Sequence, residues 1–202
     1  YASDETFLAW AAYSPNSQIR ARVWSFEETR YPDDAWLRSQ LAAAIARRAS
    51  MEPWESRNAW RLVHAESDGL PGIVVDRYAD CLVIQLSTLG ADVRRDAVVE
   101  ALTDLTGCAR IWERSDSDAR SLEGLMPREG TLLGEPVETL EILENGLRYK
   151  VDIAGGQKSG FYLDQRVNRR KLADIAAGKN VLNCFCFMIF VSSAVLAASF
   201  SS

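Results

Sequence analysis

The sequence contains one histidine, His64, and four cysteines among its 202 residues. A histidine-rich metal site is therefore excluded, and a zinc site of mixed cysteine and histidine ligands is disfavoured. The cysteines are too few and too scattered for a disulfide scaffold; they are Cys81, Cys108, Cys184 and Cys186. We expect no bound metal and a reducing, cytoplasmic setting.

An excess of positive charge is also missing, because the formal net charge is −5. Contact with a nucleic acid must then come from local basic patches rather than from the whole surface. No charged segment followed by an apolar run opens the chain, so a signal peptide is not expected. The first residue is Tyr1 rather than methionine, and we expect a fragment whose upstream part is missing.

A glycine-rich loop, a basic helix and an apolar run succeed one another between residues 154 and 187. Gly155, Gly156 and Gly160 allow a tight loop that a ligand can approach. From Leu163 onward, apolar residues recur at helical spacing until Gly178. Residues 181–185 then form a short apolar run typical of a covered parallel strand. This order predicts the beginning of a cofactor-binding α/β domain.

The first 28 residues predict a β-hairpin, because two apolar runs flank the turn-forming residues 14–17. In the second run, Arg20 and Arg22 alternate onto the same strand face as Trp24. That face is suited to a phosphate backbone or a stacked base. A solvated face with a packing tryptophan explains the pattern equally well.

The middle of the chain predicts an α+β domain from about Pro32 to Ile153. Its expected elements are a helix beginning near Pro32, three antiparallel strands between residues 61 and 87, a helix over 91–105, a strand over 109–115 and a hairpin over 137–153. Residues 116–136 are polar and turn-rich. We interpret the acidic residues of this region as parts of turns and solvated faces, not as paired catalytic carboxylates; they are Asp68, Asp76, Glu113, Asp116 and Asp118.

Four stretches occur together in a familiar order. They are AYSPNSQIRARVW, AESDGLPGIVVDRY, GQKSGFYLDQRVNR and NVLNCFC. In this order they resemble the S-adenosylmethionine (SAM)-dependent ribosomal RNA large-subunit methyltransferase I family, which makes 5-methylcytosine in 23S ribosomal RNA. Each stretch alone is a weak signal, but four in the family's order are a strong one.

The resemblance implies three parts. Residues 1–30 correspond to the C-terminal part of a β-rich PUA domain, residues 31–153 to the central α+β domain, and residues 154–202 to the incomplete start of a Rossmann-like SAM-dependent methyltransferase domain. The implied partner is ribosomal RNA, and a homodimer is left open.

The resemblance also assigns site residues. Those expected to line or brace the SAM site are Tyr162, Asp164, Gln165, Arg166, Asn168, Asn183, Cys184 and Phe185. Those expected to contact RNA are Arg20, Arg22, Arg169 and Arg170. The alternative is structural: helix-surface ion pairs for the arginines, a helix cap for Asp164 and packing for Tyr162.

After Phe185 the sequence departs from the family pattern. The family continues with an aromatic residue, a threonine and two glycines, whereas residues 186–191 are Cys, Phe, Met, Ile, Phe and Val. Bulky side chains would fill the space that the cofactor needs. The family's catalytic cysteines lie further downstream, so no catalytic residue is assigned here, and Cys184 and Cys186 are interpreted as inert thiols.

The uncharged run from Asn180 to Ser202 is long enough for a membrane span. It lacks an aromatic belt and has no flanking basic cluster beyond Lys179, so we favour an altered reading frame that stops early. Three hypotheses follow: an incomplete RNA cytosine-5 methyltransferase that does not turn over, a non-catalytic RNA-binding remnant, and a tail-anchored membrane protein.

Overall fold

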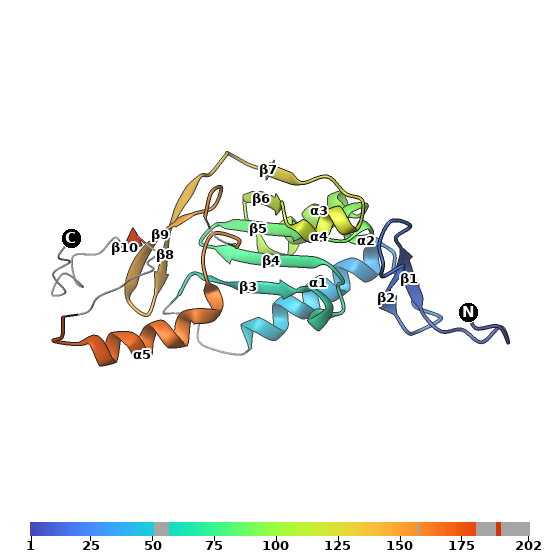
Figure 1. The fold of residues 1–202 in the computed structure, drawn as a ribbon, viewed down its shortest axis with the longest axis horizontal. Helices are drawn as coiled ribbons and strands as arrows, with labels where there is room; N and C mark the ends of the chain where they lie inside the picture. The colour runs from blue at the N-terminus through green and yellow to red at the C-terminus, as the bar shows by residue number, and fades with distance from the viewer. Residues whose placement is uncertain (51–56, 157, 181–188, 191–202) are drawn as a thin grey trace.

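The computed structural model describes residues 1–50, 57–156, 158–180 and 189–190, and a five-stranded sheet forms its centre (Figure 1). The strand order is β3 (Ala59–His64), β4 (Ile73–Tyr78), β5 (Cys81–Leu86), β6 (Arg110–Ser115) and β7 (Arg128–Leu133). The antiparallel meander β3–β4–β5 confirms the expected three strands. Strand β6 joins parallel to β5 after a helical connection, and β7 closes the other edge antiparallel.

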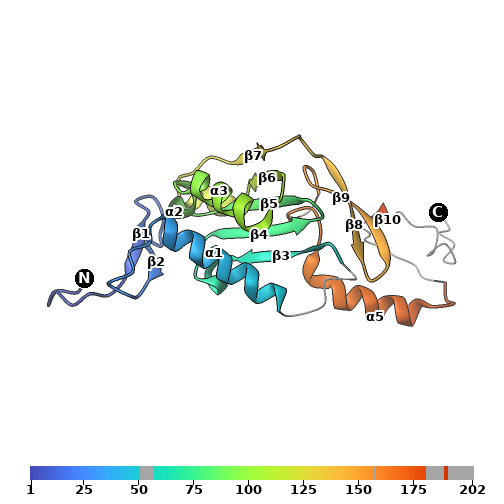
Figure 2. The same cartoon turned by 180° about the vertical axis from the view of Figure 1, so that it is seen from behind.

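Two helices lie side by side on one face of this sheet (Figure 2). Helix α1 (Asp34–Ala49) begins where expected, and the Asp33 carboxylate accepts the backbone N–H of Trp36 at 2.8 Å. This side-chain cap satisfies a donor that the first helical turn leaves open. The expected helix over 91–105 is split into a short α2 (Leu89–Asp92) and α3 (Arg95–Thr106). Between the helices and the sheet lies the main apolar core, which includes Leu37, Leu41, Ile84 and Leu102.

The expected N-terminal hairpin is present as β1 (Trp10–Tyr13) and β2 (Ala21–Ser25). Trp24 is only 6% exposed and its ring lies 5.7 Å from that of Trp36 in the main core. Arg22 reaches the buried Glu123 at 3.0 Å. The face shared by Arg22 and Trp24 therefore packs on α1, α2 and the end of the segment 118–123, which favours the alternative of a packing tryptophan. An RNA contact by Arg22 stays a prediction.

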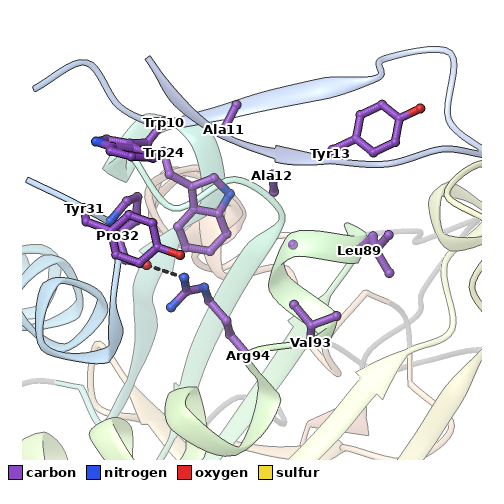
Figure 3. Close-up of a pocket in the computed structure, with 11 residues that line it drawn as sticks. Trp10, Ala11, Ala12, Tyr13, Trp24, Tyr31, Pro32, Leu89, Val93 and Arg94 are labelled. Atoms are coloured by element: carbon purple, nitrogen blue, oxygen red, sulfur yellow. Dashed lines mark hydrogen bonds between the residues drawn. The ribbon is translucent and has the colours of Figure 1, made fainter. Parts of the chain in front are cut away.

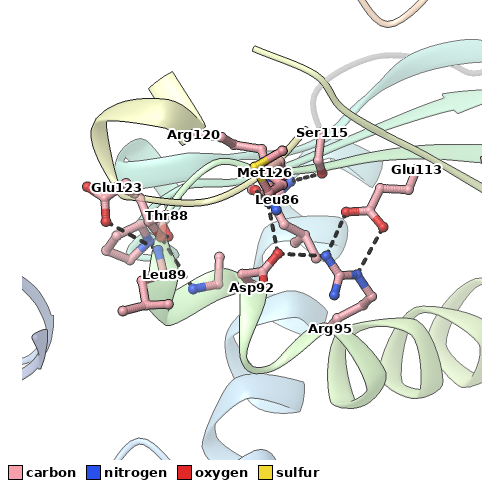
Figure 4. A network of polar contacts seen from close by, with 12 residues as sticks. Leu86, Thr88, Leu89, Asp92, Arg95, Glu113, Ser115, Arg120, Glu123 and Met126 are labelled. Atoms are coloured by element: carbon pink, nitrogen blue, oxygen red, sulfur yellow. Dashed lines mark hydrogen bonds and ion pairs between the residues drawn. The ribbon is translucent and has the colours of Figure 1, made fainter. Parts of the chain in front are cut away.

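The polar segment 116–136 is more ordered than its composition indicates, because it holds α4 (Asp118–Leu122) and β7. Arg120 is 1% exposed, and it donates to the carbonyl oxygens of Leu86 and Met126 and pairs with Asp92 at 2.9 Å. Next to it, Arg95 forms two hydrogen bonds with Glu113, of 2.9 and 3.0 Å (Figure 4). Glu113 was expected on a solvated face but is 3% exposed, so that interpretation is corrected: its charge is buried and paired.

A second, smaller sheet forms from β8 (Thr139–Glu144), β9 (Leu147–Asp152) and β10 (Ile189–Phe190), in the order β10–β9–β8. The hairpin β8–β9 confirms the expected one over 137–153. It packs with part of the central sheet in a second core that includes Tyr78, Val83, Ile142, Tyr149 and Phe161. Phe161 belongs to the glycine-rich loop, so this loop is packed against the central region.

The basic helix after the loop is present, but its apolar residues are not buried. The helical segment η3 (Leu163–Gln165) leads into α5 (Arg166–Ala176), which extends past the second sheet (Figure 1). Val167, Leu172 and Ile175 are between 56% and 64% exposed. The expected strand over 181–185 lies outside the described residues. Within the described ranges, no helix has the length and apolar character needed to cross a membrane.

The hairpin docks closely on α2, and this contact can be tested at Gly90. A Cβ atom at Gly90 would lie 2.4 Å from the Cβ of Ala12 and 3.2 Å from Nε1 of Trp24. Gly90→Ala is expected to lower the free energy of unfolding by about 1–3 kcal/mol, the usual range for overpacking. Urea unfolding followed by tryptophan fluorescence measures it.

Adding Ala12→Gly to Gly90→Ala removes the nearest clashing atom and should restore part of the lost stability. Stability that is equal in the single variant and the parent would contradict this packing.

Candidate functional site

A cavity of about 720 Å³ is lined by residues in and near β3, by Lys158 of the glycine-rich loop and by the segment from Phe161 to Arg166. We divide its lining into two groups: Arg48, Arg57, Ala59, Trp60, Arg61, His64 and Lys158 form the first, and Phe161, Tyr162, Leu163, Asp164, Gln165 and Arg166 form the second. We call these the central wall and the loop wall. The loop wall contains four of the residues expected at the SAM site.

The two walls are joined by a buried carboxylate. Asp76, in β4, is 0% exposed and accepts two hydrogen bonds from Arg61, of 2.8 and 2.9 Å. Its Oδ2 also accepts the hydroxyl hydrogen of Ser159, from the glycine-rich loop. Asp76 was expected in a solvated or turn position. The structure corrects this: the carboxylate is held in the interior because each oxygen is hydrogen-bonded.

A tyrosine extends this connection. Since Ser159 gives its only hydroxyl hydrogen to Asp76, the Tyr78 hydroxyl donates to Ser159 Oγ, 2.9 Å away. Burial raises the pKa of Tyr78 far above its usual value, so the donor hydrogen is retained at neutral pH. The loop is therefore fixed to β4 by a chain of hydrogen bonds that runs from Tyr78 through Ser159 to Asp76.

A second buried carboxylate holds the outer part of the central wall. Asp68 is 6% exposed, and its Oδ1 accepts from Arg47 at 2.6 Å and from Arg48 at 2.7 Å. Its Oδ2 accepts the backbone N–H of His64 at 2.6 Å. The expectation of a solvated turn residue is corrected for Asp68 as well. Burial opposes its ionisation, but the hydrogen bonds and charges of these partners hold the pKa of the carboxyl below its usual value.

Arg169 serves the interior rather than the surface. Its guanidinium forms two 2.7 Å hydrogen bonds with Glu144 and a third with the carbonyl oxygen of Tyr162, and it lies 4.3 Å from the ring centre of Phe161. The side chains of Arg169 and Glu144 are 9% and 4% exposed. An RNA contact does not fit this placement, and we correct that expectation: Arg169 fixes the start of α5 on β8.

The four loop-wall residues expected at the SAM site are brought together. Arg166 lies 3.3 Å from the side-chain oxygen of Asn145. Asp164 faces the positive charge of Arg61 across the cavity, which adds to the effect of Asp76 in raising the pKa of Arg61. Asp164 does not cap α5, since the N-cap residue is Gln165 and no side-chain cap bond forms.

The remaining expected residues are placed elsewhere. Asn168 donates to the side-chain oxygen of Gln165 at 2.7 Å, so it braces the loop wall from outside the cavity lining. Asn183, Cys184 and Phe185 lie outside the described residues. Arg20 is exposed and donates to the Pro15 carbonyl oxygen, and Arg170 pairs loosely with Asp174 at 3.5 Å. RNA contacts by Arg20 and Arg170 stay predictions.

The central wall was missed from the sequence. Arg61 and His64 lie in one strand that carries no ligand-binding motif, and Lys158, although it stands in the family stretch GQKSGFYLDQRVNR, is distant from them along the chain. The alternation of β3 was the only available signal, because it places Arg61 one strand position away from buried Leu62.

A smaller cavity of about 280 Å³ lies where the hairpin meets α2 and α3 (Figure 3). Arg94 crosses it, donates to the Pro32 carbonyl oxygen and lies 5.5 Å from the ring centre of Trp24. These contacts join the hairpin to the helices. Among the described residues, no group of three or more His, Cys, Asp and Glu side chains is arranged to hold a metal ion. Cys81 and Cys108 are buried free thiols, and burial raises the pKa of Cys81 to about 11.

The Glu144–Arg169 pair provides a test of how the loop wall is held. Glu144→Gln leaves the guanidinium of Arg169 buried without its counter-charge and should cost about 3–5 kcal/mol of unfolding free energy. Glu141→Gln is the matched control on the same strand, because its ion pair with Arg148 is exposed; we expect a change below about 0.5 kcal/mol. Chemical denaturation measures both, and equal effects would refute a structural role for Arg169.

The lowered pKa of Asp68 predicts a dependence of stability on pH. The pKa of the Asp68 carboxyl is lower in the folded state than its usual value of 3.8, so its ionised form stabilises the fold at pH values above 3.8. This contribution is lost as the pH falls through the pKa of the folded state. Stability should therefore drop between about pH 5 and pH 2, and Asp68→Asn should flatten part of that drop. Asp104→Asn removes a carboxylate from an exposed pair with Arg38 and should leave the slope as in the parent.

The sequence is similar to known methyltransferases. A sequence model of the S-adenosylmethionine-dependent methyltransferase family matches residues 72–202. The ribosomal RNA large subunit methyltransferase I of Shewanella denitrificans is 47% identical over 188 residues, which cover 92% of this chain and 47% of that protein. The protein of the same name from Aliivibrio fischeri is 45% identical, with 93% and 48% covered. The chain thus spans about half the length of these curated relatives.

Solved structures agree on the fold. A protein from Streptococcus mutans that is assigned as a SAM-dependent methyltransferase superposes with a TM-score of 0.71 at 23% identity, over 86% of this chain and 44% of that one. A second structure, assigned as a methyltransferase and determined in complex with SAH, gives a TM-score of 0.72 at 22% identity over the same shares. The mixed α/β architecture with a central sheet is therefore shared with these structures. The chain belongs to the S-adenosylmethionine-dependent methyltransferase family.

Proposed function

We propose that this chain is the substrate-facing and first cofactor-facing portion of a SAM-dependent enzyme that methylates C5 of a cytosine in 23S ribosomal RNA. The observation that carries the proposal is the cavity: its loop wall consists of FYLDQR, part of a family stretch, and the relatives named for large-subunit ribosomal RNA match 92–93% of the chain. Such an enzyme works in the cytoplasm, where its RNA substrate is found.

The loop wall carries groups that suit SAM. The cofactor has a carboxylate, an ammonium group and a positively charged sulfonium. Arg166 offers a guanidinium fork for the carboxylate, and Asp164 offers an acceptor for the ammonium. Tyr162 and Gln165 add one ring and one carboxamide, which are suited to the nucleoside part. When bound, SAM supplies an electrophilic methyl group; the residues of this chain bind and orient it.

The chemical step needs residues beyond those described. The family resemblance places the catalytic cysteines downstream of the stretch matched here, and Cys81 and Cys108 are buried in the central region. The proposal therefore gives this chain the roles of binding and positioning, and we expect no methyl transfer by it alone. The same proposal assigns residues 1–30 to the end of a PUA domain and residues 31–153 to a central domain.

A chimaera tests the proposed enzyme. Residues 1–180 of this chain, joined to the remaining C-terminal part of the Shewanella denitrificans relative, should transfer methyl groups from SAM to unmodified 23S ribosomal RNA. Mass spectrometry of the digested RNA should find 5-methylcytosine. Asp164→Ala in the chimaera should raise the KM for SAM about tenfold or more, the effect of losing one charge-assisted hydrogen bond.

Asp174→Ala is the matched control, since Asp174 lies on the exposed side of α5 in a loose pair with Arg170. It should leave the KM within about twofold of the parent, as expected for a surface pair. A folded chimaera that methylates another base, or one whose affinity for SAM is unchanged by Asp164→Ala, would overturn the proposal.

A non-catalytic RNA-binding protein is the second candidate, and the basic central wall favours it. Calorimetry of this chain with SAM tests how complete its cofactor site is. We expect weak binding or none, because the sequence departs from the family pattern after Phe185. Micromolar binding would show that the cofactor site is complete in this chain.

A further inference from the structure

Positive charge is concentrated in the cavity of an otherwise acidic chain. Five cationic side chains line it against one carboxylate, Asp164, while the whole chain has a net charge of −5; the cations are Arg48, Arg57, Arg61, Lys158 and Arg166. Asp68 and Asp76 lie beneath the central wall and offset part of this charge. A concave surface of one sign attracts ligands of the opposite sign, so the cavity as a whole favours a polyanion.

The donors of the central wall are held in fixed positions. Arg61 uses Nε and Nη2 on Asp76, and its Nη1 lies 3.0 Å from Nδ1 of His64. A guanidinium has no acceptor, so Nδ1 of His64 accepts this bond and the ring hydrogen is on Nε2. His64 is exposed, and its Nε2–H is the donor that it can offer to a ligand. Arg61 and His64 together present a charged and a neutral donor side by side.

Lys158 completes this set in an unusual backbone conformation. Its φ angle is +60°, a left-handed value that costs a non-glycine residue about 1 kcal/mol or more. The next residue, Ser159, is 1% exposed and bound to Asp76 and Tyr78, which fixes the backbone beside it. Lys158 is exposed, lines the cavity, and forms no ion pair with the carboxylates of the described residues. Glycine would relieve the strain, yet the position holds a cation.

We propose that the central wall, through Arg61, His64 and Lys158, binds the phosphodiester backbone of a single-stranded RNA segment and holds it opposite the loop wall. Guanidinium, ammonium and imidazole N–H groups are the usual donors to phosphate oxygens. A target base must leave its stack before it can be modified, so an unpaired strand fits a cavity of this size. The inference rests on the proposed function in one respect, that the loop wall faces the cofactor.

Fluorescence anisotropy with a labelled 12-nucleotide single-stranded RNA tests this on the whole chain. Lys158→Gln should weaken binding about three- to tenfold at 100 mM NaCl and reduce the slope of log K against log salt by about 0.7, the value for one phosphate contact with a single strand. His64→Phe removes a neutral donor and should weaken binding up to about tenfold with the slope unchanged.

Two further variants separate binding from folding. Lys158→Gly should bind RNA as weakly as Lys158→Gln while its Tm stays equal to that of the parent or rises, because the left-handed position no longer strains the backbone. Lys150→Gln is the matched control, since Lys150 lies on the face of β9 opposite the buried Tyr149 and Val151. It should change the affinity less than twofold and leave the salt slope unchanged.

The inference is overturned if Lys158→Gln and Lys150→Gln reduce binding equally, if the chain does not bind the RNA, or if 1 mM SAM displaces the RNA. The last result would mean that SAM, and not RNA, occupies the whole cavity. These outcomes are independent of methyl transfer. If the chimaera methylates RNA and the Lys158→Gln variant of this chain binds RNA as well as the parent, the inference is refuted and the proposed function stands.

Discussion

The buried carboxylate of Asp76 is the constraint on which the cavity depends. An ionised carboxylate in the interior is stable only when its oxygens are hydrogen-bonded and its charge is offset. Arg61 and Ser159 meet that requirement from two different segments, β3 and the glycine-rich loop. Because the same carboxylate binds both, the loop cannot leave the sheet without exposing the charge of Asp76 to an incomplete set of partners. The attachment of the glycine-rich loop to the sheet is therefore set by an electrostatic requirement.

Similar buried carboxylate–arginine pairs connect other elements of the molecule. Glu123 binds Arg22 of the hairpin and also accepts the backbone N–H of Leu89 at 3.2 Å, so one buried carboxylate connects β2 to α2. Glu113 and Arg95 join β6 to α3, and Glu144 and Arg169 join β8 to α5. Five acidic residues thus serve in the interior: Asp68, Asp76, Glu113, Glu123 and Glu144. The cavity is nevertheless positive in a chain of net negative charge, because five cationic side chains line it against the single carboxylate of Asp164.

The regular elements could be predicted from the sequence because local patterns specify them. The hairpin β8–β9, the meander β3–β5 and α1 follow from alternation, turn residues and a capping aspartate. The burial of Asp68, Asp76 and Glu113 could not be predicted, since a carboxylate in a strand or turn is usually solvated and each arginine partner is supplied by a different element. Lys158 was missed for a related reason: its left-handed backbone is imposed by Ser159, which is anchored only once β4 and the loop meet. For α5 the pattern predicted the helix correctly, but periodicity cannot say whether an apolar face is covered.

The division of the cavity into two walls has a consequence for how function can be lost. The central wall depends on Asp68 and Asp76, which lie in or next to the strands of the central sheet, and on Ser159, which is tied to the same sheet. The loop wall depends on η3 and the start of α5, which Glu144 holds on the second sheet through Arg169. Disruption of the chain after α5 would act on the cofactor side first, because the anchors of the central wall precede it and are bound to the larger core. A protein built in this way can keep an ordered central wall when its loop wall is disrupted.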